Sequence, residues 1–257
     1  MRQFTPYLFL LLAASFLYSC KSAKLSDAEE KQRIGEYFEA AAIYRKGYTK
    51  TPPAKRDLRG YIAFRMAECN RLINNTPRAT SAYMNALRYK YPDSIVNLRL
   101  GQMYQKSGRY GEAVKYYNDY LLAEPGSVLA FNGVTGCEEA VKWKQSPTRY
   151  TVKRMDKFNS RRSEFSPMLY GEKYDQLYFA STRTPKGAGK DKEETNSAIT
   201  GQRNNDLFLV KQDENGAWLA PVELEDEVNT EFDEGTPSFS KDGNTMYYTY
   251  CAQDPEG

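Results

Sequence analysis

A 34-residue period in the first half of the chain constrains its fold most strongly. The segment Leu100 to Pro125 reads LGQMYQKSGRYGEAVKYYNDYLLAEP. Thirty-four residues earlier, three of its positions recur with matching residue types, since Ala67, Ala79 and Tyr83 correspond to Gly101, Ala113 and Tyr117. A further copy, stretched to 39 residues by the insert PPAKR, carries Ala40, Tyr44 and Gly47. Amphipathic helices alone would align apolar positions, but they would not align Gly, Ala and Pro. The period therefore predicts stacked helical hairpins over residues 26–146.

Each repeated residue has a role in such a hairpin. Gly101 allows two helices to approach closely, Gly108 ends the first helix, and Pro125 stops the second. The pattern resembles the tetratricopeptide repeat (TPR), whose unit is also 34 residues long. The resemblance implies three hairpins and a terminal helix over about 127–143, stacked into a solenoid with a concave face.

The resemblance also yields the predicted partner-binding residues. Arg71, Gln102 and Lys106 fall on polar positions of the concave face. The alternative is that these three side chains are ordinary solvated surface. Residues 24–147 hold 20 Lys and Arg against 13 Asp and Glu, whereas residues 148–257 hold 14 against 20. This asymmetry indicates either two domains with different solvated faces or a basic half that meets an acidic partner or a phosphate-rich surface.

The second half has a different pattern, in which short strands alternate with turns. DQLYFAST, NDLFLVKQ and NTMYYTY are rich in Tyr, Phe and Val, and QDENG and SKDG are typical of tight turns. A Ser/Thr-Pro entry occurs twice, as EFSP from Glu164 and as EGTP from Glu234. We therefore predict a linker over 147–163 and a repeated strand-rich domain over 164–257.

This arrangement resembles blades of the TolB-type, WD-like β-propeller found in OmpA-family envelope proteins. The resemblance implies that each Ser/Thr-Pro entry begins a blade and that the polar segment 184–205 is an insertion. A propeller closes a ring of about four to eight blades, and this sequence holds one blade and the start of another. We therefore expect a longer protein. The predicted fold class is α + β multidomain, with an N-terminal TPR α-solenoid followed by the start of a β-propeller.

The first twenty residues, MRQFTPYLFLLLAASFLYSC, have one early Arg and then an apolar core. The core is too short for a comfortable membrane span and is typical of an export signal. Leu17 to Cys20 resembles a bacterial lipoprotein signal, with Tyr18 as a bulky departure. The resemblance implies a signal peptide over 1–19, lipidation of Cys20 and a lipidated linker over 20–25. The alternative is an ordinary secretory signal with an incidental Cys.

Several classes of chemistry are excluded or disfavoured. The chain has no His, which removes Ser-His-Asp, Cys-His and HExxH sites. Cys69, Cys137 and Cys251 lack metal-ligand spacing, and we predict that the first two are small buried thiols. Asp206 precedes a predicted strand, and we predict that its side chain stabilises a turn through hydrogen bonds to backbone N–H groups. The acidic run from Glu223 to Glu234 lacks a calcium-loop spacing and is predicted to be a solvated loop. No catalytic residue, metal or cofactor is predicted.

These features together predict a non-enzymatic outer-membrane lipoprotein that acts as an interaction and tethering scaffold. The order of its parts resembles that of PorE-type envelope components of the type IX secretion system, from Bacteroidota. That resemblance implies secretion-system or other envelope protein partners, and peptidoglycan only through an OmpA-like domain downstream. In lipoproteins of the Bacteroidota, which this chain resembles, an early acidic run favours the cell surface, so its absence after Cys20 implies a periplasm-facing protein. No basic run is dense enough to predict nucleic-acid binding. Two alternatives remain open: a propeller-containing peptidase with its catalytic domain downstream, and a propeller ligand sensor.

Overall fold

The computed structural model describes residues 25–184, 196–225 and 227–252. The predicted signal peptide and Cys20 lie outside these residues. The chain forms two compact units, and the main division falls between Arg149 and Tyr150, with Ala198–Thr200 also belonging to the first unit. This division lies inside the segment 147–163 that the sequence predicts as a linker.

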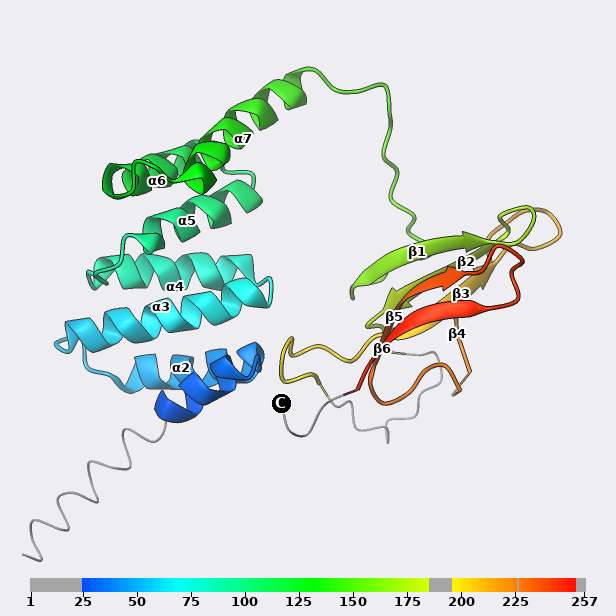
Figure 1. Ribbon diagram of the computed structural model, residues 1–257, viewed down its shortest axis with the longest axis horizontal. Coiled ribbons are helices and arrows are strands. Elements are labelled where there is room, and N and C mark those ends of the chain that lie inside the picture. Colours follow the sequence, from blue (N-terminus) through cyan, green and yellow to red (C-terminus); the bar gives the residue numbers. More distant parts are fainter. Residues whose placement is uncertain (1–24, 185–195, 226, 253–257) are drawn as a thin grey trace, which may run out of the picture. The chain divides into compact units, whose positions relative to one another are not determined.

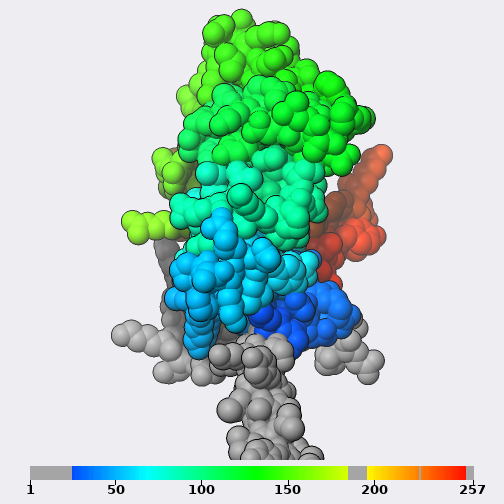
Figure 2. Space-filling view, turned by 90° about the vertical axis from the view of Figure 1, so that its left-hand side faces the viewer, coloured from blue at the N-terminus to red at the C-terminus, as the bar shows by residue number. Residues whose placement is uncertain are grey.

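The first unit contains seven helices within the described residues. They are residues 25–33, α2 (Tyr37–Lys50), α3 (Arg56–Leu72), α4 (Thr76–Arg88), α5 (Ile95–Lys106), α6 (Tyr110–Ala123) and α7 (Val128–Gln145). From α2 onward each helix packs on the next one in the chain, so that they form successive layers from blue to green in Figures 1 and 2. This unit is a TPR-like α-solenoid, as the 34-residue period predicts.

The turns inside the hairpins explain where the helices end. Asn74 after α3 and Gly108 after α5 stand 34 residues apart and both have positive φ, at 63° and 72°. This left-handed conformation ends a helix, and it favours Gly or Asn. Asn75 then accepts a hydrogen bond from the backbone N–H of Arg78 at 3.4 Å, which caps α4. The predicted terminal helix is confirmed as α7, capped by Ser127.

Three repeated tyrosines form the centre of the solenoid. Tyr44, Tyr83 and Tyr117 are all fully buried. A Cβ atom on Gly101 of α5 would lie 2.6 Å from the Tyr117 ring, and one on Gly133 of α7 would lie 2.4 Å from it. The Tyr117 ring therefore fills the space that these two glycines leave between α5 and α7.

The second unit is antiparallel β structure. Its strands are β1 (Glu164–Tyr170), β2 (Gln176–Ser181), β3 (Asp206–Lys211), β4 (Val222–Glu223), β5 (Asp233–Phe239) and β6 (Met246–Cys251). The first four form one sheet in chain order, and β5 pairs with β6. Phe158 packs with Phe179, Phe208 and Trp218 in the core of this unit, so the segment predicted as a linker contributes a core residue.

The two Ser/Thr-Pro entries adopt the same structure. The β1–β2 ladder is interrupted at Ser166-Pro167 and the β5–β6 ladder at Thr236-Pro237. Ser166 and Thr236 have positive φ, at 52° and 50°, which is uncommon for residues other than glycine. The sequence repeat is therefore a structural repeat. The described residues hold one four-stranded sheet and one further hairpin, and these do not make a closed propeller.

The second hairpin packs on the first sheet through aromatic side chains. The rings of Tyr170 in β1 and Phe239 in β5 stack with centroids 4.1 Å apart, and Tyr178 contacts the same phenylalanine. The Tyr170 hydroxyl donates to the Gly243 carbonyl at 2.8 Å. Within the described residues, no helix has the length and apolar character that crossing a membrane requires.

Candidate protein-interaction surface

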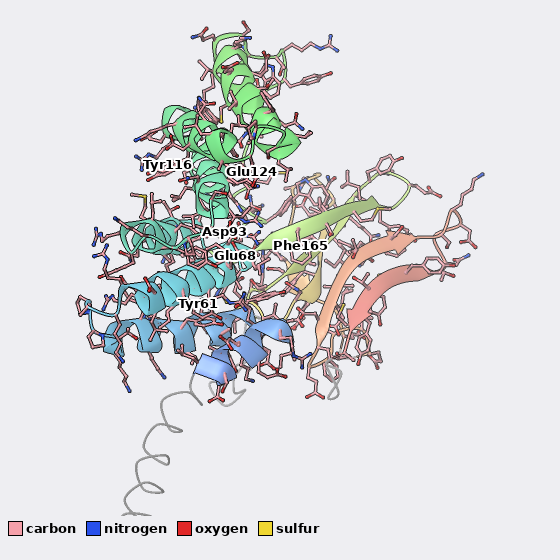
Figure 3. The ribbon with its side chains drawn as sticks, turned by 60° about the vertical axis from the view of Figure 1, so that its left-hand side comes forward. Tyr61, Glu68, Asp93, Tyr116, Glu124 and Phe165 are labelled. Atoms are coloured by element: carbon pink, nitrogen blue, oxygen red, sulfur yellow. The ribbon has the colours of Figure 1, made fainter. Side chains whose placement is uncertain are left out.

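A polar network joins the first helices of two successive hairpins, α3 and α5. Its centre is the Glu68 carboxylate on α3, which Figure 3 labels. Arg71 Nη2 donates to Glu68 Oε2 at 2.7 Å, and Arg99 Nε of α5 lies 3.3 Å from Glu68 Oε1. The hydroxyl of buried Tyr83, on α4, donates to the same carboxylate. One carboxylate thus holds side chains from three helices.

The charges of this network are fixed by their surroundings. Burial raises the pKa of the Glu68 carboxyl, but hydrogen bonds from Arg71 and Tyr83 more than offset this, and the net pKa lies below its ordinary value. Burial and the neighbouring Glu68 charge raise the pKa of Tyr83. Glu68 is therefore an anion and Tyr83 a neutral donor at neutral pH.

All three predicted partner-binding residues belong to this region of α3 and α5. Arg71 is bound to Glu68, Gln102 Oε1 accepts from Arg99 Nη1 at 3.1 Å, and Lys106 Nζ donates to the Asn74 side chain. Arg71 and Gln102 are half-buried, whereas Lys106 is exposed. The structure thus brings the three residues onto neighbouring helices and engages each of them in a hydrogen bond within the chain.

We define the α3–α5 polar strip as six ionic and amide side chains of these two helices: Arg65, Glu68, Arg71, Arg99, Gln102 and Lys106. It contains four cations and one carboxylate. Tyr61, also labelled in Figure 3, continues the polar surface toward the first helix, because its hydroxyl donates to Glu29 Oε1 at 2.5 Å. An extended, negatively charged segment of a partner protein would complement this strip.

Sequence reasoning missed Glu68 and Arg99, the two residues that organise the strip. A signal for them was present, because Arg65 and Arg99 stand 34 residues apart and so do Glu68 and Gln102. The same repeat phase therefore carries polar residues at two positions, three residues apart, in both first helices. The ionic contacts themselves depend on side chains of α3 and α5 that meet across the stack, which the period does not specify.

A separate hollow of about 430 Å³ lies among α2, α3 and α4. Phe38, Met66 and Ala82 contribute apolar wall, and Arg45 and Arg78 are exposed side chains of the lining. It involves the second helices α2 and α4, and none of its lining residues belongs to the α3–α5 polar strip.

The remaining candidates have structural explanations. Cys69 and Cys137 are buried, as predicted, and burial raises the pKa of the Cys69 thiol to about 12. Buried Asp206 is bound by the Arg203 guanidinium. The prediction of a solvated acidic loop is wrong at Glu234, which is 1% exposed. No cluster with metal-binding composition occurs among the residues that the structure describes.

Comparisons with known proteins give the following. No family model matches the chain, and no curated protein matches it. Two crystal structures of MamA are similar to this chain, each at 16% sequence identity. The first has a TM-score of 0.43 and covers 49% of this chain and 70% of the MamA chain. The second has a TM-score of 0.41 and covers 52% of this chain and 79% of the MamA chain. The C-terminal TPR-containing domain of a Plasmodium falciparum FK506-binding protein has 16% identity and a TM-score of 0.42, over 49% of this chain and 91% of that domain. We base the TPR-like description on the 34-residue period and on the observed helical hairpins.

Proposed function

We propose that this protein is a non-enzymatic interaction scaffold whose α3–α5 polar strip binds an acidic, extended segment of a partner protein. The observation that carries this proposal is that Glu68 holds the guanidinium groups of Arg71 and Arg99 together across two successive first helices, which also carry Arg65 and Lys106. Glu68 holds the side chains of Arg71 and Arg99 in place, so less side-chain entropy is lost when a partner binds them.

The strip retains the donors that such a partner needs. A guanidinium has five N–H groups in a fixed fork, so Arg71 and Arg99 can each donate to a second carboxylate in addition to Glu68. Lys106 is exposed and can contribute a further charged donor at the C-terminal end of α5. Gln102 lies beside Arg99 and supplies an amide that can bond the partner backbone.

The test is affinity capture of the tagged full-length protein from detergent-solubilised envelopes after mild crosslinking, read by mass spectrometry. The double variant Arg71→Gln, Lys106→Gln should lose the partner. The matched control is Arg33→Gln, Arg109→Gln, which removes two exposed arginines that pair locally with Glu30 and Glu112. A partner that is lost equally from both variants, or from neither, would contradict the assignment of the strip.

We further propose that lipidated Cys20 anchors the scaffold to the inner leaflet of the outer membrane. Two or more acyl chains on one residue anchor a protein stably. Tethering raises the effective concentration of the binding surface toward membrane partners. The Cys20→Ala variant should move to the soluble periplasmic fraction, and its retention in the membrane fraction after a salt wash would show the anchor to be wrongly assigned.

The second unit is proposed to be the start of a TolB-type propeller. The matching distortions at Ser166 and Thr236 support this, because each begins a hairpin of the same design. In this proposal an OmpA-like domain downstream would link a type IX secretion apparatus to peptidoglycan. The gene sequence beyond residue 257 tests it: an OmpA-like domain favours the scaffold, whereas a GxSxG nucleophile elbow favours the peptidase alternative. A ligand-induced rise in melting temperature would favour the sensor.

A further inference from the structure

A basic cavity lies at the N-terminal end of the solenoid. It has a volume of about 570 Å³ and is bounded by the first helix, α2 and the start of α3. Four aliphatic side chains form its apolar wall: Leu25, Ile43, Leu58 and Ile62. Three lysines also line it, namely Lys46, Lys50 and Lys55, and Asp27 is the acidic residue among the lining side chains.

The three lysines are available for an external anion. All three are exposed. Lys46 and Lys50 stand four residues apart and therefore share one face of α2. Among the ion pairs found between described residues, none includes Lys46, Lys50 or Lys55. The cavity thus combines an apolar wall with three ammonium groups and one carboxylate.

The third lysine comes from the segment that breaks the repeat. Tyr83 and Tyr117 are 34 residues apart, but Tyr44 and Tyr83 are 39 apart because of the insert PPAKR. A helical hairpin does not need these extra residues, yet they place Pro52 and Lys55 in the cavity lining. The loop is also held in place, since the Arg59 guanidinium donates to the Thr51 carbonyl and lies 4.1 Å from the Tyr48 ring centroid. This insert therefore builds a defined basic surface.

We propose that this cavity and its three lysines form a docking surface for anionic phospholipid headgroups. The proposal rests on the proposed lipid anchor at Cys20. Leu25 lines the cavity and follows Cys20 by five residues, so the chain can span at most about 18 Å between them. An acylated Cys20 would therefore keep the lysines close to the headgroup layer. The ammonium groups would bind lipid phosphates, and Leu58 and Pro52 would contact the glycerol region.

The experiment uses the chain from residue 20 onward, which keeps every described residue, with Cys20→Ser to remove the acyl chains. Its partitioning is measured by co-sedimentation with phosphatidylglycerol–phosphatidylcholine vesicles and with pure phosphatidylcholine vesicles. The test variant is Lys46→Glu, Lys50→Glu, Lys55→Glu, and a Gln version removes the charges without reversing them. The matched control is Lys90→Glu, Lys115→Glu, Lys144→Glu, which alters three exposed lysines elsewhere on the solenoid. Far-UV circular dichroism confirms that each variant is folded.

Each lysine close to an anionic surface contributes about 1 kcal/mol, so loss of three charges corresponds to about 100-fold weaker partitioning on the anionic vesicles. The Gln variant should show this loss, and the fold-decrease in partitioning of the control should be at least ten times smaller. Equal loss in test and control variants would overturn the proposal, because it would indicate attraction by overall charge alone. Equal binding of the parent chain to neutral vesicles would overturn it as well.

Acylation is measured separately, by incorporation of an alkyne-tagged fatty acid in cells into the natural sequence and into Cys20→Ala. Absence of label from the natural sequence would remove the anchor while leaving the vesicle result intact. Failure of the headgroup site and failure of the anchor are thus distinguishable.

Discussion

The two glycines that face Tyr117 make a sharp prediction about stability. Gly101→Ala places a Cβ atom 2.6 Å from Tyr117 Cδ1, and Gly133→Ala places one 2.4 Å from Tyr117 Cζ. Either distance is far below van der Waals contact, so the ring must move. The Tyr117 hydroxyl donates to Gln105 Oε1 at 2.6 Å, and a shift of the ring would weaken that bond.

The size of the destabilisation follows from one stabilising and two destabilising contributions. Alanine in place of glycine within a helix stabilises by about 1 kcal/mol. Overpacking of a tightly filled core costs about 1–3 kcal/mol, and loss of the hydroxyl hydrogen bond costs about 1 kcal/mol more. We therefore expect each variant to be destabilised by about 1–3 kcal/mol, which lowers the melting temperature by about 2–4 °C per kcal/mol at this size.

The assay is denaturant unfolding of the full chain followed by far-UV circular dichroism, which reports mainly the helical unit. The matched control is Gly111→Ala in α6, where a Cβ atom would meet nothing within 4 Å. That control should be stabilised by up to about 1 kcal/mol. The Tyr117→Leu background should remove most of the penalty of Gly101→Ala. If Gly101→Ala behaved like Gly111→Ala, the reasoning on this packing would be refuted.

Three further predictions concern titratable groups. The folded-state pKa of Glu68 lies below its unfolded value of about 4.3. The stability that its charge contributes is therefore present above that pH and is lost as pH falls through the folded pKa. Glu68→Gln should lower the free energy of unfolding at neutral pH by about 1–3 kcal/mol, and should make stability depend less on pH in the acid range. Burial raises the pKa of Glu234, whose Oε2 is buried without a hydrogen-bond partner, so stability should fall as pH rises from about 4.3 through the folded pKa. Glu234→Gln should therefore stabilise the chain by about 1–2 kcal/mol at neutral pH, and a destabilised variant in urea titrations would contradict this. In native protein Cys251 should react with iodoacetamide while Cys69 and Cys137 stay protected until unfolding, and rapid labelling of all three thiols would contradict their burial.

The helical half could be predicted from sequence because its signals are local and repeated. A TPR-like hairpin needs a small residue where helices cross and a left-handed residue in its turn, and the sequence shows both at fixed spacing. The phase of Tyr83 and Tyr117 therefore predicts their burial, and Gly108 predicts the end of α5. The candidate partner-binding residues Arg71, Gln102 and Lys106 were predicted only by position. Their contacts with Glu68 and Arg99 depend on side chains that meet across two helices, which spacing alone does not determine.

The strand-rich half shows where repetition is a less reliable guide. Glu164 and Glu234 occupy the same place before the two Ser/Thr-Pro distortions, and each accepts a hydroxyl hydrogen bond from four residues earlier, from Ser160 and Thr230.

Their surroundings then diverge, because the Arg183 guanidinium binds Glu164 at 3.0 Å whereas Glu234 lies near the carboxylates of Asp206 and Asp233. Desolvation acts on both acids. At Glu164 the hydrogen bonds from Ser160 and the pairing with Arg183 together outweigh desolvation and lower the pKa. At Glu234 the hydrogen bonds from Thr230 do not outweigh it, because the charges of Asp206 and Asp233 add to desolvation, and the pKa rises. Identical backbone design thus places one acid in a stable ion pair and the other in a site that a cationic or hydrogen-bond donor would stabilise.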